Sequence, residues 1–425
     1  MQDFTPIEQL TVWRRLAQGE RVPVGQLTQN RQGIFFQYAP EYLDHYTSLS
    51  PFNLRFDASI QLAPKRPHGG LHGVFADSLP DGWGLMLMDR VFRQVGVLPH
   101  QVTPLDRLAF IGQNGMGALE YEPVSDLASS STETLNISEL GLQAQALFEG
   151  QTKIVLAALV QAGSSGGARP KAQLYLDPDQ PELCSTTPKQ GMRPYLVKFT
   201  SSHLPLGHEE SLCEAAYLTM AKQAGINTQA WQLLPAPPTS GAKAWLALER
   251  FDCTKQGGRL HLHSAAGLLD ANFREPSLDY EDLIKASSVL CKEEQVGQEQ
   301  FRRAIFNLFA LNQDDHAKNW AFLMDDKGQW LPSPFYDVTF SPNPYGEHAT
   351  AYGGYGKNPP LKALQHLATI AGLANWQAAQ LIIHEVTEVI STWEATAKLL
   401  GISQETRVLI NRQLTSTREK LKYLT

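Results

Sequence analysis

The sequence predicts an α+β fold divided into two or three packed units, and three observations support this class. The chain has 425 residues, and at roughly 100 to 200 residues per domain this length exceeds one ordinary core. Its middle part contains short strand-like runs, whereas its C-terminal part has the apolar spacing of helices. A hydrophobic fraction of 43% and a charged fraction of 19% are typical of a folded globular protein.

The first part of the chain, residues 1–125, is predicted to be a small α/β unit. It contains a β-like run at Gly33–Tyr38 and a candidate helix after Leu79-Pro-Asp-Gly-Trp-Gly84. No chemistry is recognisable in this unit, so we expect it to dock a substrate or a partner. The stretch that begins at Ser125 is rich in Ser and Thr, and it predicts a surface linker over residues 126–149.

Residues 150–252 are predicted to form a lobe of strands with one helix. The helix candidate runs from Ser211 to Gly225 and ends at a glycine suited to the C′ position. The strand candidates are Lys171–Leu176, Tyr195–Phe199 and Ala244–Phe251.

The last part, residues 253–425, is predicted to be a mostly helical lobe. One helix runs into Leu311, because its apolar residues follow the i, i+4, i+7, i+8 spacing of a single helix face. These residues are Phe301, Ile305, Leu308 and Phe309. The rest of the chain also has helical patterns.

Composition and charge argue against several classes of protein. A formal net charge of −7 does not suit a dominant nucleic-acid surface, since phosphates are neutralised by clustered Lys and Arg. Any contact with DNA is therefore expected through a partner. The four cysteines lack CxxC spacing, which fits a reducing compartment without zinc. No signal-like N-terminus and no apolar run of about 18 residues occurs, so we expect a cytoplasmic protein without a membrane partner.

The most informative stretch is a polar loop between the helix that ends near Leu311 and a short apolar strand. Phosphoryl transfer to a hydroxyl group requires a carboxylate that accepts the proton, and Asn and Asp side chains that hold Mg²⁺. Asp314 and Asn319 have the D-x-x-x-x-N spacing of a kinase catalytic loop, whereas Asp315 does not.

A hairpin is predicted to bring a second metal-binding carboxylate to this loop. It consists of Trp320–Leu323, a turn at Asp325–Gly328, and Trp330–Tyr336. The returning strand places Asp337 at the level of Asn319, so Asp314, Asn319 and Asp337 form the predicted catalytic set.

Two further elements could contact a nucleotide. Lys198 lies on a strand with alternating apolar residues and is a candidate phosphate-binding cation, with Glu214 or Glu210 as its acidic partner. A glycine-rich loop at 163–172 can present backbone N–H groups to phosphate, and it carries Arg169 and Lys171. Its serines, Ser164 and Ser165, are candidates for phosphorylation.

Together these segments resemble the HipA family of toxin kinases. The similar motifs are GGARPKA, YLVKF, ERFD, DDHAKNWAFL and YDV, which occur in this order between about residues 163 and 340. Residues 69–84 also resemble the N-terminal subdomain of that family. The resemblance implies a bilobal, protein-kinase-like fold with a mostly helical C-terminal lobe, and it implies ATP and Mg²⁺ as cofactors.

The resemblance also implies partners and site residues. A member of this family phosphorylates a protein of translation, typically an aminoacyl-tRNA synthetase, and is neutralised by a helix-turn-helix antitoxin. Glu249 and Phe251 correspond to the adenine hinge, His316 to a residue near the nucleotide, and Ser164 to a loop serine that is autophosphorylated. The predicted nucleotide-binding residues are Ser165, Gly166, Gly167, Lys171, Lys198, Glu249, Phe251 and His316.

Two other functions compete with an active kinase. A pseudokinase or repressor subunit would bind ATP or an antitoxin without turnover. A metal-dependent hydrolase would use Asp314, Asp315 and His316, and it would bind metal without nucleotide. A kinase would bind metal chiefly together with ATP.

Overall fold

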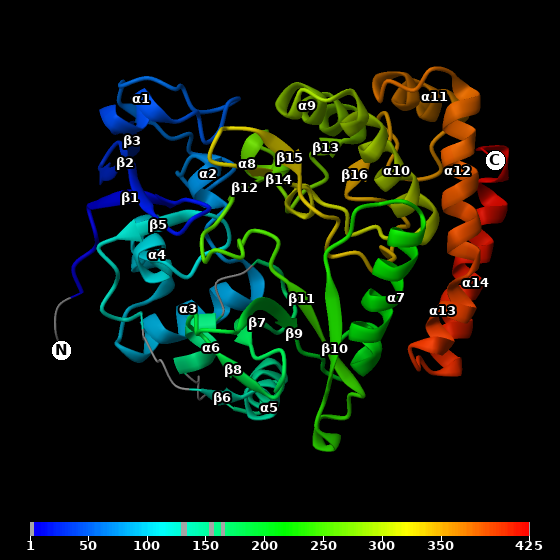
Figure 1. Cartoon of the computed structure of the whole chain (residues 1–425), viewed down its shortest axis with the longest axis horizontal. Helices are drawn as coiled ribbons and strands as arrows, with labels where there is room; N and C mark the ends of the chain where they lie inside the picture. Colours follow the sequence, from blue (N-terminus) through cyan, green and yellow to red (C-terminus); the bar gives the residue numbers. More distant parts are fainter. Residues whose placement is uncertain (1–3, 129–133, 153–156, 163–165, 425) are drawn as a thin grey trace.

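The computed structural model of the chain describes residues 4–128, 134–152, 157–162 and 166–424. It shows the predicted α+β class, with an N-terminal unit, a central sheet and a helical C-terminal lobe side by side (Figure 1). Among these residues, no helix is long and apolar enough to cross a membrane.

The N-terminal unit contains an antiparallel sheet in which five strands of the described chain have the order β4-β3-β2-β1-β5. Alternate residues of β1 are buried, as expected for a sheet with one face against a core. The predicted strand at Gly33–Tyr38 is confirmed, and the helix predicted after the Leu79–Gly84 motif is confirmed as α3, although it begins within the motif, at Gly82. The elements are β1 (Gln9–Arg15), β2 (Arg21–Asn30), β3 (Gly33–Tyr38), α1 (Pro40–His45), β4 (Gln61–Leu62), α2 (Gly73–Ala76), α3 (Gly82–Gln94), α4 (Pro104–Ile111) and β5 (Leu119–Glu122).

The central sheet has six strands within the described ranges, in the order β10-β11-β9-β7-β8-β6. Its register places Lys171 of β7 opposite Lys198 of β9, so both predicted nucleotide-binding lysines lie at one end of the sheet. The elements are β6 (Leu135–Asn136), α5 (Ile137–Phe148), α6 (Ala157–Ala162), β7 (Lys171–Leu176), β8 (Leu183–Ser185), β9 (Arg193–Lys198), α7 (Glu210–Gln223), β10 (Trp231–Pro235) and β11 (Ala244–Glu249).

The linker predicted over 126–149 is wrong for its second half. Helix α5 occupies Ile137–Phe148. The side chain of Asn136 caps this helix by accepting hydrogen bonds from two backbone N–H groups. Leu140, Ala144 and Leu147 pack into the core beneath the central sheet. The Ser- and Thr-rich composition therefore marks only the start of this segment, and the helical spacing of its apolar residues decides the rest. The other predicted domain limits remain predictions.

The C-terminal lobe is helical around a small three-stranded sheet, counted over the described residues. Helix α10 buries all four apolar residues that predicted it, and the predicted hairpin is confirmed as β14 and β15. The elements are β12 (His261–Ser264), α8 (Ala265–Leu268), β13 (Leu278–Asp279), α9 (Tyr280–Cys291), α10 (Glu294–Ala310), β14 (Ala321–Met324), β15 (Trp330–Pro332), β16 (Thr350–Ala351), α11 (Leu361–Ile370), α12 (Trp376–Ser391), α13 (Trp393–Leu399) and α14 (Gln404–Lys420).

One hydrophobic core joins the N-terminal unit to the C-terminal lobe. It includes residues of β1, β2 and β3 together with residues of α9, α10 and α12. At the contact between α2 and α8, a Cβ atom on Gly73 would lie 2.1 Å from the carbonyl oxygen of Gly267, so only glycine permits this approach. A second core lies between the central sheet, α5 and α6, and it includes Trp83 and Leu87 of α3.

Candidate active site

The predicted catalytic loop lies between α10 and the hairpin. Leu311 ends α10 with a φ angle of 54°, which turns the chain toward the hairpin. The Asn319 Nδ2 atom donates a hydrogen bond of 2.7 Å to the carbonyl oxygen of Asp314 and so closes the loop. The side chain of Asp314 is 56% exposed and lines the cleft between the units. A carboxylate at this place can reach a hydroxyl group that enters from solvent.

The environment of Asp314 suits a proton acceptor. Partial burial raises the pKa of its carboxyl group, His316 at 3.8 Å lowers the pKa, and Asp337 raises it. The net shift is upward, so Asp314 takes up a proton more readily than an ordinary aspartate. General-base catalysis favours such a shift, because an ideal base has a pKa near the working pH.

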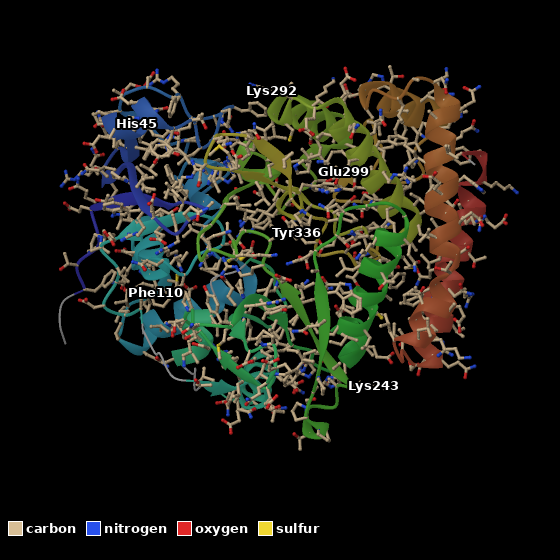
Figure 2. All side chains as sticks on the ribbon, in the orientation of Figure 1. His45, Phe110, Lys243, Lys292, Glu299 and Tyr336 are labelled. Atoms are coloured by element: carbon tan, nitrogen blue, oxygen red, sulfur yellow. The ribbon has the colours of Figure 1, made fainter. Side chains whose placement is uncertain are left out.

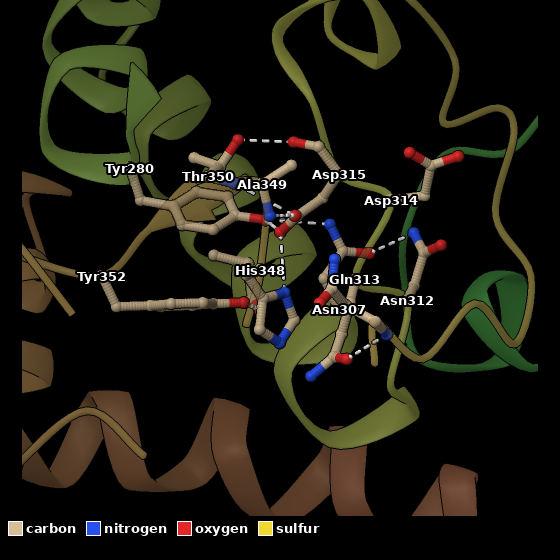
Figure 3. Close-up of polar contacts among 12 residues, drawn as sticks. Tyr280, Asn307, Asn312, Gln313, Asp314, Asp315, His348, Ala349, Thr350 and Tyr352 are labelled. Atoms are coloured by element: carbon tan, nitrogen blue, oxygen red, sulfur yellow. Dashed lines mark hydrogen bonds and ion pairs between the residues drawn. The ribbon is translucent and has the colours of Figure 1, made fainter. Parts of the chain in front are cut away.

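The neighbouring Asp315 faces away from the cleft. Its side chain is fully buried, and its Oδ2 atom lies 2.6 Å from the hydroxyl group of Tyr280 and 2.9 Å from Nδ1 of His348. Its Oδ1 atom accepts hydrogen bonds of 2.9 and 3.2 Å from the backbone N–H groups of Ala349 and Thr350. Figure 3 shows these contacts, and none of its dashed lines reaches the carboxylate of Asp314. Asp315 therefore holds the chain that follows Asp337 rather than a ligand.

The hydrolase alternative does not fit this arrangement, because it needs Asp315 in the cleft. Within the described part of the chain, no group of three His, Cys, Asp or Glu side chains could hold a metal ion.

Asp337 follows the hairpin and lines the same cleft as Asp314. Its φ angle is 55°, a left-handed conformation that aspartate tolerates better than most residues. Its Oδ1 atom forms an ion pair with Nζ of Lys198. Burial alone would raise the pKa of Asp337, but Lys198, Lys171 and Arg169 outweigh burial and hold the pKa well below its usual range. Asp337 is therefore ionised at neutral pH.

Asn319 and Asp337 offer the oxygen atoms that a magnesium ion prefers. The amide nitrogen of Asn319 is used in the loop, which leaves its Oδ1 as an acceptor. Among the described residues, the Oδ2 atom of Asp337 accepts no hydrogen bond. Magnesium is usually held by one or two carboxylates together with substrate phosphates and water. The donor set fits an ion that arrives with a nucleotide, and the metal remains a prediction.

Lys198, the last residue of β9, is held by an acidic residue of α7. Its Nζ atom lies 2.6 and 2.8 Å from the two carboxylate oxygens of Glu214, and both side chains are buried. Of the two acidic partners considered from the sequence, Glu214 is confirmed, whereas Glu210 pairs with Arg169 at 2.8 Å. Burial would lower the pKa of Lys198, but Asp337 and Glu214 raise it, so the lysine stays charged.

We expect Glu214→Gln to raise the KM for ATP and lower the rate, together by about tenfold, because charged hydrogen bonds contribute about 1.5 to 3 kcal/mol. Without the charge of Glu214, Lys198 would pair more closely with Asp337 and be less available to phosphate. Steady-state kinetics with varied ATP measure the effect. Glu281→Gln, which removes an exposed pair with Lys285 on α9, is the matched control. Unchanged kinetics in Glu214→Gln would show that the pair is structural only.

The described part of the glycine-rich loop begins at Gly166. Lys171 donates a hydrogen bond of 2.8 Å from Nζ to the carbonyl oxygen of Gly166, and burial lowers the pKa of this lysine. Gly167 has a φ angle of 98°, a backbone conformation that favours glycine. A Cβ atom there would lie 2.2 Å from Nζ of Lys171, so a larger residue would also displace this lysine. Ser164 and Ser165 lie outside the described residues, and their phosphorylation stays a prediction.

These elements surround one cavity of about 420 Å³. This volume is in the usual range for small-molecule sites, and its walls mix apolar side chains with a few charged ones. Tyr336, at the centre of the molecule in Figure 2, lines the cavity together with Phe251, and the centroids of their rings are 5.6 Å apart. The predicted residues that line the cavity are Gly166, Gly167, Lys171, Lys198, Phe251, Asp314, His316, Asn319 and Asp337.

Glu249 is the described site residue that does not line this cavity. It is the last residue of β11. Its backbone N–H donates a hydrogen bond to the carbonyl oxygen of Ala230, and its own carbonyl oxygen accepts a hydrogen bond of 2.8 Å from Nε2 of Gln229. Gln229 itself lines the cavity. The hinge role of Glu249 stays a prediction. Gln229, which donates to Glu249, is a polar group of the cavity wall.

The N-terminal unit contributes to the cavity, which was not predicted from the sequence. That unit was expected to dock a partner, but Asp77, Leu79, Asp81, Gly82 and Met116 line the cavity. The signal was the Leu79–Gly84 motif, which served to predict a helix and a family resemblance but no site residue. Lys318, inside the catalytic motif itself, also lines the cavity and was not singled out.

The fold and the cleft define a bilobal α+β protein of the protein-kinase-like class. Residues 163–393, more than half of the chain, match the family model described as the HipA-like C-terminal domain, and residues 18–122 match the HipA N-terminal domain. The chain therefore belongs to the HipA-like family, as its motifs predicted.

Individual relatives agree with this assignment. A Sinorhizobium fredii protein named "Putative kinase Y4dM" is 28% identical over 210 residues, which are 45% of this chain and 50% of that protein. The chain thus matches about half the length of this curated relative. A solved structure of HipA from a Shewanella oneidensis complex with HipB and operator DNA has a TM-score of 0.69 at 17% identity, covering 97% of this chain and 96% of that chain. At this identity the likeness concerns the fold.

Proposed function

We propose that this chain is an ATP- and Mg²⁺-dependent serine/threonine protein kinase of the toxin type. The observation that carries the proposal is the convergence of Asp314, Asn319 and Asp337 on one cavity that Lys198, the ion-pair partner of Glu214, also lines. Phosphoryl transfer needs a proton acceptor, metal-binding oxygens and a phosphate-binding cation at one place. These five side chains supply those three functions.

Each residue has a defined role in the proposed reaction. The substrate hydroxyl oxygen forms a bond to the γ-phosphorus of ATP, the bond to the β–γ bridging oxygen breaks, and Asp314 receives the hydroxyl proton. Asn319 and Asp337 would hold Mg²⁺, which neutralises charge on the phosphates when bound. Lys198 and Lys171 place two ammonium groups at the phosphate end of the cleft.

The substrate and the partner are finer parts of the same proposal. We propose a protein of translation, of the aminoacyl-tRNA synthetase class, as substrate, and Ser164 or Ser165 as the site of autophosphorylation. The Shewanella oneidensis structure contains HipA with HipB and operator DNA. That complex supports a helix-turn-helix antitoxin as partner, with DNA contacted through the antitoxin. We also propose a cytoplasmic location.

The test is a transfer assay with γ-labelled ATP. Protein freed of prior phosphate is incubated with Mg²⁺, alone and with cell extract, and peptides from residues 150–175 are analysed by mass spectrometry. We expect label on Ser164 or Ser165, or on an extract protein. Removal of metal with EDTA should abolish the label, and Asp337→Asn should reduce it by about 10²-fold or more, since charge stabilisation in the transition state is lost.

Asp282→Asn is the control, because Asp282 is exposed on α9 and does not line the cavity. It should label like wild type. If wild type binds ATP as tightly as Asp337→Asn and neither transfers phosphate, the pseudokinase or repressor function replaces the kinase. If neither binds ATP, the kinase and the ATP-binding pseudokinase are both excluded, and a repressor subunit that binds an antitoxin takes their place.

A further inference from the structure

Asp81 occupies an unusual place at the start of α3. It is the N-cap residue of that helix, yet its carboxylate makes no capping hydrogen bond. The Oδ1 atom instead accepts a hydrogen bond from the backbone N–H of Gly167, and the Oδ2 atom lies 3.0 Å from Nζ of Lys318. Only 13% of the side chain is exposed. An N-cap carboxylate normally stabilises its own helix, so this one serves contacts elsewhere.

The two partners of Asp81 belong to the two loops that would handle phosphate. Gly167 is part of the glycine-rich loop above the cavity, and Lys318 lies between the proposed base Asp314 and the metal ligand Asn319. One carboxylate of the N-terminal unit therefore joins a loop of the central sheet to a loop of the C-terminal lobe.

The backbone next to Asp81 supports the same contact. The N–H of Trp83 donates a hydrogen bond of 3.0 Å to the carbonyl oxygen of Gly167, and its indole Nε1 donates one of 2.9 Å to the carbonyl oxygen of Lys171. A Cβ atom on Gly82 would lie 2.7 Å from Cα of Ala168, so these two segments of the backbone approach so closely that only glycine fits. The glycine-rich loop is thus seated on residues 81–83.

Lys318 is held in a fixed position as well. Its Nζ atom lies 4.4 Å from the centroid of the Phe273 ring, and the carboxylate of Asp81 contacts it from another direction. Burial would raise the pKa of Asp81, but Lys318 and the N–H of Gly167 outweigh burial and lower it. The carboxylate is consequently ionised at neutral pH, and its contact with Nζ orients Lys318 at the cavity.

We propose that Asp81 is a positioning residue for phosphoryl transfer, which ties the glycine-rich loop and Lys318 into their places before a nucleotide binds. The proposal rests on the proposed kinase function. It gives the N-terminal unit a part in the reaction through the loops, without contact between Asp81 and the reacting atoms.

Two variants separate the contact of Asp81 with Gly167 from its contact with Lys318. Asp81→Asn keeps an oxygen for the N–H of Gly167 but cannot form an ion pair with Lys318, whereas Asp81→Ala loses both. We expect Asp81→Asn to weaken ATP binding by about tenfold, measured by calorimetry with Mg²⁺, since a charged contact has that order of effect. In a Lys318→Met background the same substitution should have almost no further effect, because the two residues act together.

Hydrogen exchange tests the clamp without any nucleotide. In Asp81→Ala, amides of residues 166–173 should exchange about tenfold faster than in wild type, since local opening becomes easier. The matched control is Asp89→Asn on the same helix, which removes an ion pair with Arg107 of 2.7 Å outside the cavity. It should change neither exchange in this loop nor ATP affinity, even if it lowers the melting temperature.

The outcomes distinguish this proposal from the proposed function. If wild type binds ATP, and Asp81→Asn binds it equally, the positioning role is overturned and the kinase stands. Unchanged exchange in Asp81→Ala, or additive losses with Lys318→Met, would also overturn it. Failure of wild type to bind ATP would overturn both proposals.

Discussion

Replacing Asp314 with Asn is expected to lower the rate of phosphoryl transfer by about 10²- to 10⁴-fold, the usual contribution of a general base. The carboxylate is half-exposed, and its contact with His316, at 3.8 Å, is long. Stability and ATP affinity should therefore change little. The measurement is a single-turnover assay with γ-labelled ATP, combined with a binding titration and thermal unfolding.

The pH dependence gives an independent check on Asp314. Because burial in the cleft raises the pKa of this carboxyl, it becomes protonated at a higher pH than an ordinary aspartate when the solution is acidified. The transfer rate should fall on the acidic side accordingly, and this acidic limb should be absent from Asp314→Asn. A variant that transfers phosphate at the wild-type rate would remove Asp314 from the mechanism. Asp282→Asn again serves as the control.

Replacing the neighbouring Asp315 with Ala should instead lower the free energy of unfolding by about 3 to 5 kcal/mol, the usual effect of breaking a buried polar network. Its two carboxylate oxygens satisfy groups of Tyr280, His348, Ala349 and Thr350. Without the carboxylate these buried groups lose their partner, which costs more than the hydrogen bonds themselves contribute. Urea unfolding, followed by circular dichroism, measures the change.

Asp282→Ala is the control for this second prediction, because it removes an exposed carboxylate of α9 and should change stability by less than about 0.5 kcal/mol. Any activity that Asp315→Ala retains below its melting temperature should approach that of wild type. A stable Asp315→Ala protein without transfer activity would mean that Asp315 takes part in the chemistry after all.

The sequence was sufficient for the parts of the site that depend on short-range patterns. Asp314 and Asn319 lie on one loop, and their spacing is visible in the sequence. The helix before this loop and the strand after it are both predicted by their apolar residues. The hairpin that returns Asp337 is likewise local, since its turn and both strands lie within about 20 residues of Asn319. Glu214 could be named as the partner of Lys198 because the helix spacing offered few acidic residues.

The missed features depend on contacts between distant parts of the chain. Asp81 and Lys318 are more than 200 residues apart, and nothing in the local sequence of either one indicates the other. Helix α5 was hidden because serines and threonines precede it, although Leu140, Ala144 and Leu147 have helical spacing. Glu249 is a different case, because its hinge role came from a motif, whereas the structure shows only its backbone hydrogen bonds and does not place it in the cavity wall.

The hydrophobic core shared by the N-terminal unit and the C-terminal lobe has a consequence for how the chain can be divided. The two family matches end and begin on either side of residues 123–162, which suggests two modules of sequence. Packing divides the molecule differently, because the strands β1 to β3 bury their apolar face in the same core as α9, α10 and α12. A gene cut between the two matches would encode fragments that each expose half of one core, so the sequence modules are not units of cooperative folding.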